Sequence, residues 1–359
     1  MVSAARLDLN DVSSFPTRRV EEWKYTDVRR YLREAPKGSE PFEVAPHSGP
    51  FDRLEAHEGV FANGHWLLQL ASDPIAHEGN QITIFGRKGF EERPEVPHLQ
   101  MLRFVSSGDN GWQASVGLTV GPNDHCVLLE SYEGEGGYVA NVALNIAVLD
   151  GGRLDRIVLA EDDGDALAFS RADVILSPGA TFNQTVVSTG AKLQRIETHV
   201  AHPGEGAEVQ MDGVYLLTGA RHADMTSVVS HSGLNGVTSQ LTKGVVRDQA
   251  RGVFQGKIIV QRGADGTDAR MGHHALILSE WGEVDAKPEL EIYADDVQCA
   301  HGNTVGALDE SALFYMQQRG LSADEARALL VQAFLIEVVD RIDHEGARER
   351  VREWLTARL

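Results

Sequence analysis

Residues 172–200 read ADVILSPGATFNQTVVSTGAKLQRIETHV and contain three short apolar runs divided by turn-forming residues. The runs are Ala172–Leu176, Phe182–Val187 and Leu193–Val200, and Ser177-Pro178-Gly179 separates the first two. Short runs rich in Val and Ile, bounded by Gly, Pro, Ser or Asn, are typical of β-strands. This stretch therefore predicts consecutive strands with tight turns and no helix between them.

The same pattern extends in both directions, over about 98–305. Long segments with a 3.6-residue apolar period are almost absent from this region, which argues against helices there. A mainly β core is therefore expected. The further strand-like runs are Val139–Leu149, Arg156–Leu159, Val214–Leu217, Met225–Val229, Val253–Val260, Ala275–Leu278 and Leu290–Tyr293.

A weak similarity between two segments of the sequence, an internal echo, favours a repeating architecture. The segment GGRLDRI at 151–157 resembles GAKLQRI at 190–196. Two coils of about 20 residues, a typical length for short solenoid repeats, would separate the segments in this way. An antiparallel sandwich would also produce many short strands. The echo favours a right-handed parallel β-helix over the sandwich.

The two ends of the chain differ from this β region. Residues 1–97 form a helical or mixed region, with a helix expected from Pro16 onward, and Pro94 and Pro97 mark its boundary. Residues 98–305 are the β-helix core. Residues 306–359 are expected to be helical and to cover an end of the solenoid, since an open sheet edge invites pairing.

Capping signals support helices in the C-terminal region. An apolar stretch ends at Gly320, a residue type that favours helix C-termini. Ser322 and Glu325 then form the S-x-x-E pattern of a capping box, followed by an apolar stripe at helical spacing.

Composition excludes several classes of partner. The 359 residues include 53 acidic and 33 basic side chains, which give a formal net charge of −20. This charge repels phosphate backbones, so a nucleic acid partner is not expected. No apolar run reaches the length that spans a bilayer, and Met1–Asn10 lacks a signal-peptide apolar segment. With two cysteines, Cys126 and Cys299, a cytoplasmic protein without disulfides is expected.

Motifs of common enzymes are missing. The segment GVFQGKI at 252–258 is one residue short of a P-loop and lacks its hydroxyl residue. The patterns G-x-G-x-x-G, H-E-x-x-H, C-x-x-C and G-x-S-x-G are also absent, so an autonomous nucleotidase, zinc protease, dinucleotide enzyme or α/β-hydrolase is disfavoured.

The strongest candidate for a functional site is the segment Cys299-Ala300-His301. A thiolate and an imidazole two residues apart on a strand can reach one metal, but zinc and iron–sulfur sites need four ligands. Cys126 could be a third ligand only if the fold brings it close. From spacing alone, the structural interpretation is favoured, in which Cys299 is a small buried hydrophobic residue.

Other polar groups carry weaker signals. His222 and His231 flank a polar stretch, and the adjacent His273 and His274 should point to opposite faces of a strand. Acidic residues on a concave face could instead hold a sugar, which keeps a carbohydrate-active enzyme as an alternative function. These acidic residues are Asp265, Asp268, Asp285, Asp295 and Asp296.

Longer segments resemble a known family. They are SQLTKG at 239–244, DQARGVFQGKI at 248–258, KPELEIYADDV at 287–297 and CAHGNTVG at 299–306. Together with PTRR at 16–19 and EEWKYTD at 21–27, they are similar to the SufB/SufD family of iron–sulfur cluster assembly proteins. Gly302 follows the histidine, as in SufD-like chains, where SufB-like chains carry Glu. His273 and His274 depart from the family pattern.

The resemblance implies a right-handed parallel β-helix between helical ends, in a complex with SufB and the ATPase SufC. It implies that Cys299 and His301 lie at the SufB interface as ligands of a transient iron–sulfur cluster, which reverses the structural interpretation of this pair. It further implies a non-enzymatic scaffold subunit whose C-terminal helices bind SufC. A homodimer of the isolated chain and a flavin in the complex stay open, as does an inert Cys299/His301 pair in a subunit that only braces SufB.

Overall fold

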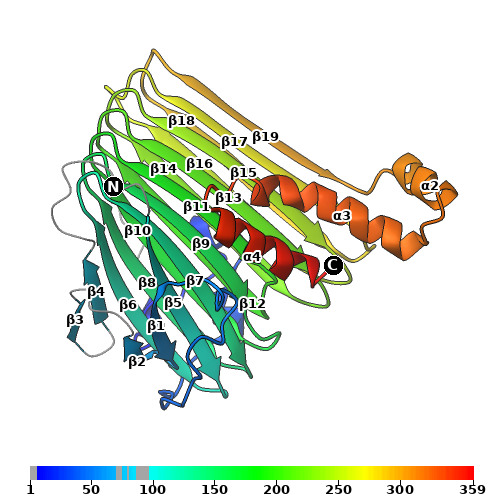
Figure 1. Cartoon of the computed structure of the whole chain (residues 1–359), viewed down its shortest axis with the longest axis horizontal. Helices are drawn as coiled ribbons and strands as arrows, with labels where there is room; N and C mark the ends of the chain where they lie inside the picture. The colour runs from blue at the N-terminus through cyan, green and yellow to red at the C-terminus, as the bar shows by residue number, and fades with distance from the viewer. Residues whose placement is uncertain (1–5, 70–74, 79–80, 86–96) are drawn as a thin grey trace.

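The computed structural model describes residues 6–69, 75–78, 81–85 and 97–359. The chain forms a parallel β-solenoid of about seven turns with a few helices at its ends (Figure 1). From β5 onward, successive strands alternate between two sheets, called sheet A and sheet B. Sheet B contains β1 (His57–Ala62), β2 (His65–Gln69), β5 (His98–Ser107), β7 (His125–Glu135), β9 (Arg153–Glu161), β11 (Thr181–Ser188), β13 (Glu208–Leu217), β15 (Val237–Val246), β17 (Asp268–Ile277) and β19 (Gln298–Gly306).

Over the described residues the second sheet has nine strands. Neighbouring strands pair in parallel in both sheets, except for β1 with β2 and β3 with β4. The prediction of a parallel β-helix rather than an antiparallel sandwich is therefore confirmed. Sheet A contains β3 (Ile75–Glu78), β4 (Gln81–Phe85), β6 (Gly111–Val120), β8 (Val139–Val148), β10 (Leu167–Leu176), β12 (Leu193–His202), β14 (His222–His231), β16 (Arg251–Val260) and β18 (Glu283–Ile292).

The length of one coil differs from the predicted value. Partners in neighbouring strands of one sheet are separated by one full coil, and Leu167 pairs with Leu193 while Arg251 pairs with Glu283. Both coils are longer than the coil inferred from the echo, so that inference is wrong. The two halves of the echo lie at the starts of β9 and β12, which belong to opposite sheets. Their similarity reflects the common way in which a strand begins after a Gly-containing turn, not a whole number of coils.

A column of turn residues marks the true repeat. Asn123, Gly151, Gly179, Gly206 and Asn235 all have φ between 55° and 65°. The amide of each residue donates to a backbone carbonyl in the turn of the next coil, as from Gly151 to Pro178. Left-handed backbone is accessible to Gly and Asn at little cost, so these turns stack without strain.

Three apolar clusters among the described residues hold the molecule together. The first fills the solenoid between the two sheets. The second lies between the outer face of sheet B and helices α3 (Ala323–Val339) and α4 (Glu345–Thr356), which cross that face in Figure 1. The third joins the N-terminal segment to the outer face of sheet A. Each sheet is therefore covered partly from outside by one end of the chain.

The helical signals of the C-terminal region are confirmed. Helix α2 (Glu310–Gln318) is followed by Gly320 with a φ of 96°, and Ser322 and Glu325 form both hydrogen bonds of a capping box at the start of α3. The expected placement is wrong, because α3 and α4 pack along the side of sheet B and do not cover an end of the solenoid.

Two further points concern the chain as a whole. No helix among the described residues is long and apolar enough to cross a membrane. The division of the chain into three regions, with boundaries at residues 97 and 305, stays a prediction. Pro94, one of the two prolines taken to mark the first boundary, lies outside the described residues.

The N-terminal segment is less helical than expected. It contains the 3₁₀ turns Val12–Ser14 and Glu21–Trp23 and the short helix α1 (Val28–Tyr31). Trp23 and Val28 pack against sheet A instead of forming the stripe of one long helix. Contacts with the sheet therefore override the local helical spacing.

Two glycines make room for a large side chain inside the solenoid. Tyr215 is fully buried, and its ring crosses Gly244 and Gly252. A Cβ atom at Gly244 would lie 1.8 Å from the Tyr215 Cζ atom, and one at Gly252 would lie 2.5 Å from Cε2. Both glycines belong to the segments that carry the family resemblance, so these segments encode the packing of the interior.

We expect Gly244→Ala to lower the free energy of unfolding by about 1–3 kcal/mol, because the new methyl group overpacks the interior against Tyr215. Gly38→Ala is the matched control, since a Cβ atom there meets nothing within 4 Å. Urea unfolding of the two variants and the wild type measures the difference. Equal stability of Gly244→Ala and Gly38→Ala would contradict the packing argument.

A second prediction concerns acid stability. His202 and His231 are fully buried with ring centroids 4.5 Å apart, and burial lowers the pKa of His231 to about 3, with a further contribution from His202. Unfolded histidine binds a proton near pH 6.5. The unfolded state therefore gains protons first, and stability is lost as the pH falls below about 6.5.

We expect His231→Gln to flatten the fall in unfolding free energy between pH 7 and pH 5, measured by urea titration at several pH values. Gln does not titrate and can still hydrogen-bond Thr238, the present partner of His231 Nε2 at 2.9 Å. His274→Gln, the same substitution at a half-buried histidine, is the control. A His231→Gln profile as steep as that of the wild type would refute this origin of the acid sensitivity.

Candidate functional site

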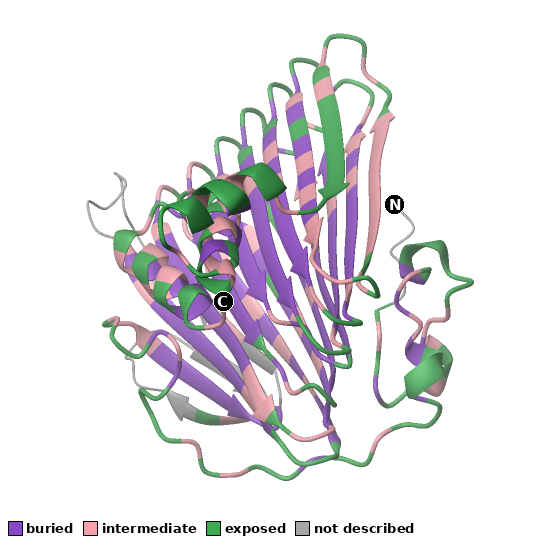
Figure 2. Ribbon diagram, turned by 90° about the vertical axis from the view of Figure 1, so that its right-hand side faces the viewer, coloured by how far each residue is buried: buried purple, intermediate pink, exposed green. Residues whose placement is uncertain are grey.

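The last coil of the solenoid presents an open end. Strand β19 is the terminal strand of sheet B and β18 is the terminal strand of sheet A. Their residues are exposed or half-buried, whereas the preceding strands are largely buried (Figure 2). Both edges can therefore accept contacts from another molecule.

Cys299 and His301 lie at this open end, on the same face of β19. Cys299 pairs in register with Ala269, and His301 pairs with Met271. Ala269 and Met271 belong to the interior cluster, and Cys299 packs against it. The two site residues thus occupy inward-facing positions, and His301 is exposed because no described coil follows β19.

The protonation state of the Cys299 side chain is compatible with a ligand that becomes charged only when it binds a metal. Partial burial raises the pKa of the Cys299 thiol, and the nearby carboxylate of Asp268 raises it further. At neutral pH the free side chain is therefore a thiol, and coordination to a metal would release its proton. Among the described residues, no group of three or more His, Cys, Asp or Glu side chains could hold a metal ion. A metal at Cys299 and His301 would need further ligands from elsewhere.

Cys126 is excluded as that further ligand. It lies in β7, and the strands β9, β11, β13, β15 and β17 separate it from β19 in sheet B. With neighbouring strands about 4.8 Å apart, six steps place the two cysteines about 29 Å from each other. Both cysteines are free.

The adjacent histidines of β17 point to opposite faces, as predicted. His273 is buried inside the solenoid, and its ring stacks on Phe254 with a centroid distance of 4.7 Å. Its Nε2 atom is 2.9 Å from the Tyr215 hydroxyl, and its Nδ1 atom is 2.7 Å from Oδ1 of Asn303. Burial lowers the pKa of His273 to about 4, so its ring is neutral.

His274 makes the equivalent contact on the outer face. Its Nδ1 atom is 2.7 Å from the hydroxyl of Thr304, the residue that follows Asn303 in β19. The two histidines thus tie the terminal strand to the coil behind it on both faces.

The polar stretch between His222 and His231 serves to attach the N-terminal segment. The buried carboxylate of Asp224 accepts hydrogen bonds from the Thr26 hydroxyl and from Arg195 Nη1 at 2.8 Å. The Arg195 guanidinium also lies 4.2 Å from the centre of the Trp23 ring. Trp23 and Thr26 belong to the EEWKYTD segment, whose role is therefore the docking of the N-terminal segment onto sheet A.

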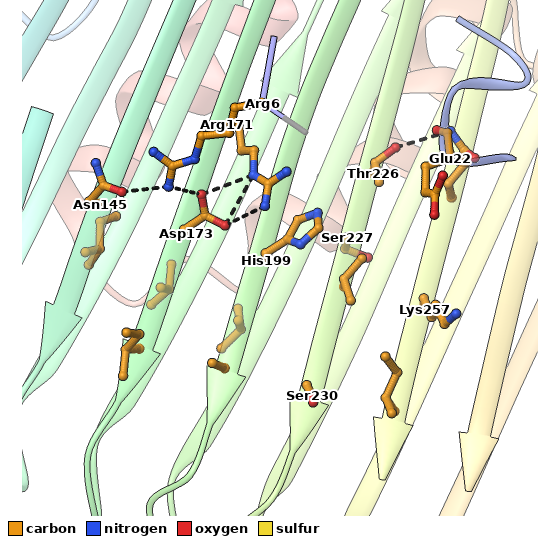
Figure 3. A pocket seen from close by; sticks show the side chains of 18 of the residues that line it. Arg6, Glu22, Asn145, Arg171, Asp173, His199, Thr226, Ser227, Ser230 and Lys257 are labelled. Atoms are coloured by element: carbon orange, nitrogen blue, oxygen red, sulfur yellow. Dashed lines mark hydrogen bonds and ion pairs between the residues drawn. The ribbon is translucent and has the colours of Figure 1, made fainter. Parts of the chain in front are cut away.

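A groove of about 780 Å³ crosses the outer face of sheet A (Figure 3). Figure 3 shows Arg6 and Arg171 around Asp173 on one side, with His199 and Lys257 further along the sheet. Each basic side chain that lines the groove has an acidic partner, so the groove offers no unpaired cation among the described residues. The pairs are Arg6 with Asp173, Arg171 with Asp173, His199 with Glu197, Lys257 with Glu291, and Lys287 with Glu21 and Glu289.

The aspartates considered for sugar binding do not line this groove. Asp285 pairs with Arg251 and Asp268 pairs with Arg270. Asp265, Asp295 and Asp296 lie in the turns that connect strands. These aspartates therefore do not supply this groove with the pair of carboxylates that glycosidic chemistry requires.

Helix α2 projects beyond the solenoid in Figure 1. It also exposes two aromatic side chains. Phe314 is 62% exposed and Tyr315 is 58% exposed, and α2 contacts α3. Aromatic residues are enriched in protein–protein interfaces, so this part of α2 is a candidate interaction surface.

Sequence reasoning missed the chain of contacts from Tyr215 through His273 to Asn303. The adjacent histidines were noticed, but their partners are distant in sequence, and only the strand register reveals them. The turn residues that recur at nearly constant spacing from Asn123 to Asn235 were the available signal for that register.

Comparisons with known proteins identify the family of this chain. The family model described as SUF system FeS cluster assembly, SufBD core domain, matches residues 103–334. The chain is 26% identical to the iron–sulfur cluster assembly protein SufD of Escherichia coli, over 97% of this chain and 90% of the relative. It is also 26% identical to a SufBD family protein of Synechocystis, over 98% of this chain and 89% of the relative.

A plant relative matches a smaller part. The chain is 29% identical to protein ABCI7, chloroplastic, of Arabidopsis thaliana, over 74% of this chain and 54% of the relative. The family model covers well over half of the chain, including β19 and its site residues. This chain belongs to the SufB/SufD family of iron–sulfur cluster assembly proteins.

Proposed function

We propose that this chain is a SufD-like subunit of a cytoplasmic SufBCD scaffold complex, and that its open end docks against SufB. The main support for this proposal is that Cys299 and His301 lie on the same inward face of the terminal strand. Two ligands on an exposed edge suit a site that a partner completes.

In this proposal a nascent iron–sulfur cluster is cargo held between the two subunits. Imidazole binds cluster iron in place of thiolate, as in Rieske centres. His301 is exposed and is the first ligand, whereas Cys299 is half-buried and becomes a ligand once its thiol loses its proton. A scaffold has to release its cluster, and ligands shared between two subunits can be separated by a movement of the subunits.

The subunit performs no turnover of its own in this proposal. Helix α2 and the adjoining part of α3 bind the SufC ATPase through Phe314 and Tyr315, so ATP hydrolysis takes place in the partner. The missing P-loop in this chain supports that division of roles. In the absence of SufB, the same open end would pair two copies of this chain into a homodimer. A flavin, where one is present, is proposed only at the level of the whole complex.

We expect His301→Ala to fold and to enter the complex but to lower cluster formation, because the exposed ring contributes a ligand and little packing. The measurement is the visible absorption and iron content of the complex co-expressed with SufB and SufC and purified without oxygen. His274→Ala, which removes a half-buried histidine from the outer face of the adjacent strand, is the control. A wild-type cluster yield from His301→Ala would favour a subunit that only braces SufB.

We expect Phe314→Ala with Tyr315→Ala to weaken binding of SufC by roughly 30-fold or more, since truncated aromatic anchors typically cost at least about 2 kcal/mol. Titration of the purified chain with SufC by calorimetry gives the affinity. Ile175→Ala removes a similarly exposed apolar side chain from sheet A and should change nothing. Unchanged affinity in the α2 variant would place the ATPase surface elsewhere.

A further inference from the structure

A line of hydrogen bonds crosses the inside of the solenoid and ends beside the site residues. Tyr215 lies on β13, and its ring passes over Gly244 of β15 to reach His273 of β17. His273 in turn contacts Asn303 of β19, its register partner. The line thus connects the buried interior with the terminal strand.

The buried phenol determines which nitrogen of His273 carries the hydrogen. Tyr215 is fully buried, and His273 Nε2, at 2.9 Å, is the partner available to its hydroxyl hydrogen. A buried hydroxyl that does not donate loses a hydrogen bond, so Nε2 accepts from Tyr215. In the neutral ring the hydrogen then resides on Nδ1, which donates to Oδ1 of Asn303 at 2.7 Å.

This bond fixes the orientation of the Asn303 amide. Its oxygen is held toward the interior by His273, so its NH₂ group is directed away from that bond, toward the open end. Asn303 follows His301 by two positions on the same face of β19, which separates their Cα atoms by about 7 Å. An oriented pair of N–H donors therefore lies beside the proposed ligands.

We propose that His273 is a positioning residue that presents the Asn303 amide as a hydrogen-bond donor to a sulfur atom of the cluster held at Cys299 and His301. The inference rests on the proposed function. Hydrogen bonds to cluster sulfurs stabilise the more negative, reduced state and raise the reduction potential.

The outer face of the same two strands supplies a matched control. His274 contacts Thr304 with the same 2.7 Å separation as His273 and Asn303, and the two pairs are adjacent in the register. His274→Phe therefore removes an equivalent contact between β17 and β19 without touching the inward face.

The test is the reduction potential of the cluster on the complex co-expressed with SufB and SufC, measured for wild type, His273→Phe, Asn303→Leu, the double variant and His274→Phe. Phe at 273 keeps a ring stacked on Phe254 but neither hydrogen bond. We expect both single variants to lower the potential, the double variant to lower it no further than Asn303→Leu, and His274→Phe to match the wild type.

The outcomes separate this inference from the proposed function. A wild-type complex without a cluster, or an unaffected His301→Ala variant, would overturn the proposed function. A normal cluster in all variants with unchanged potentials would overturn only the positioning role. Additive shifts in the double variant would also overturn it, because His273 would then act without Asn303. Should His273→Phe fail to fold, Tyr215→Phe removes one bond of the line, and an unchanged potential there and in Asn303→Leu would likewise refute the role.

Discussion

Backbone hydrogen bonding between successive coils is the constraint on which the rest of this structure depends. Each strand of a parallel solenoid pairs with the strand one coil before and one coil after it, so a chain of finite length must end on strands with a free edge. Here the free edge is formed by β18 and β19, which are nearly as long as the strands behind them. An edge of this kind is a ready surface for another chain.

The first coils and the outer faces of the two sheets differ from that edge, because other parts of the chain pair with them or cover them. Strand β2 and strand β3 turn back in antiparallel pairs at the other end of the two sheets. Helices α3 and α4 cover sheet B, and the N-terminal segment is attached to sheet A by the Thr26–Asp224 hydrogen bond and by the contact of Trp23 with Arg195. The C-terminal helices thus pack along the side of the solenoid and leave its last coil open.

Much of the fold was predictable because it depends on local pattern. Runs such as Phe182–Val187 between turn residues indicate strands, and Ser322 with Glu325 indicates the start of a helix. The coil length was not predictable from the echo at Gly151 and Gly190, because both segments record how a strand begins and not where its partner lies.

The interior of the solenoid was harder to predict than its strands. The alternation of apolar and polar residues along a strand assigns charged residues to the surface. Arg156 nevertheless points inward and is 1% exposed. Its Nε atom is 2.6 Å from Glu130, and its Nη1 atom is 2.6 Å from Gln184. Such a charge is tolerated because its hydrogen bonds are satisfied by strands one coil away. Those partners follow only from the register, and this is also why the Tyr215–His273–Asn303 line could not be read from the sequence.

The register also explains why Cys299 and His301 can be accommodated on the last coil. Along sheet B, Ala269 is followed by Cys299, Met271 by His301, and His273 by Asn303. A free imidazole at position 271 would be buried within the apolar interior, where an unsatisfied polar group costs about 1–3 kcal/mol. One coil later, the same inward position is open to solvent or to a partner, and the cost disappears. Inward-facing polar side chains that lack a hydrogen-bond partner are therefore compatible with folding only where the stack ends, so the end of the solenoid is where this architecture can place a shared site.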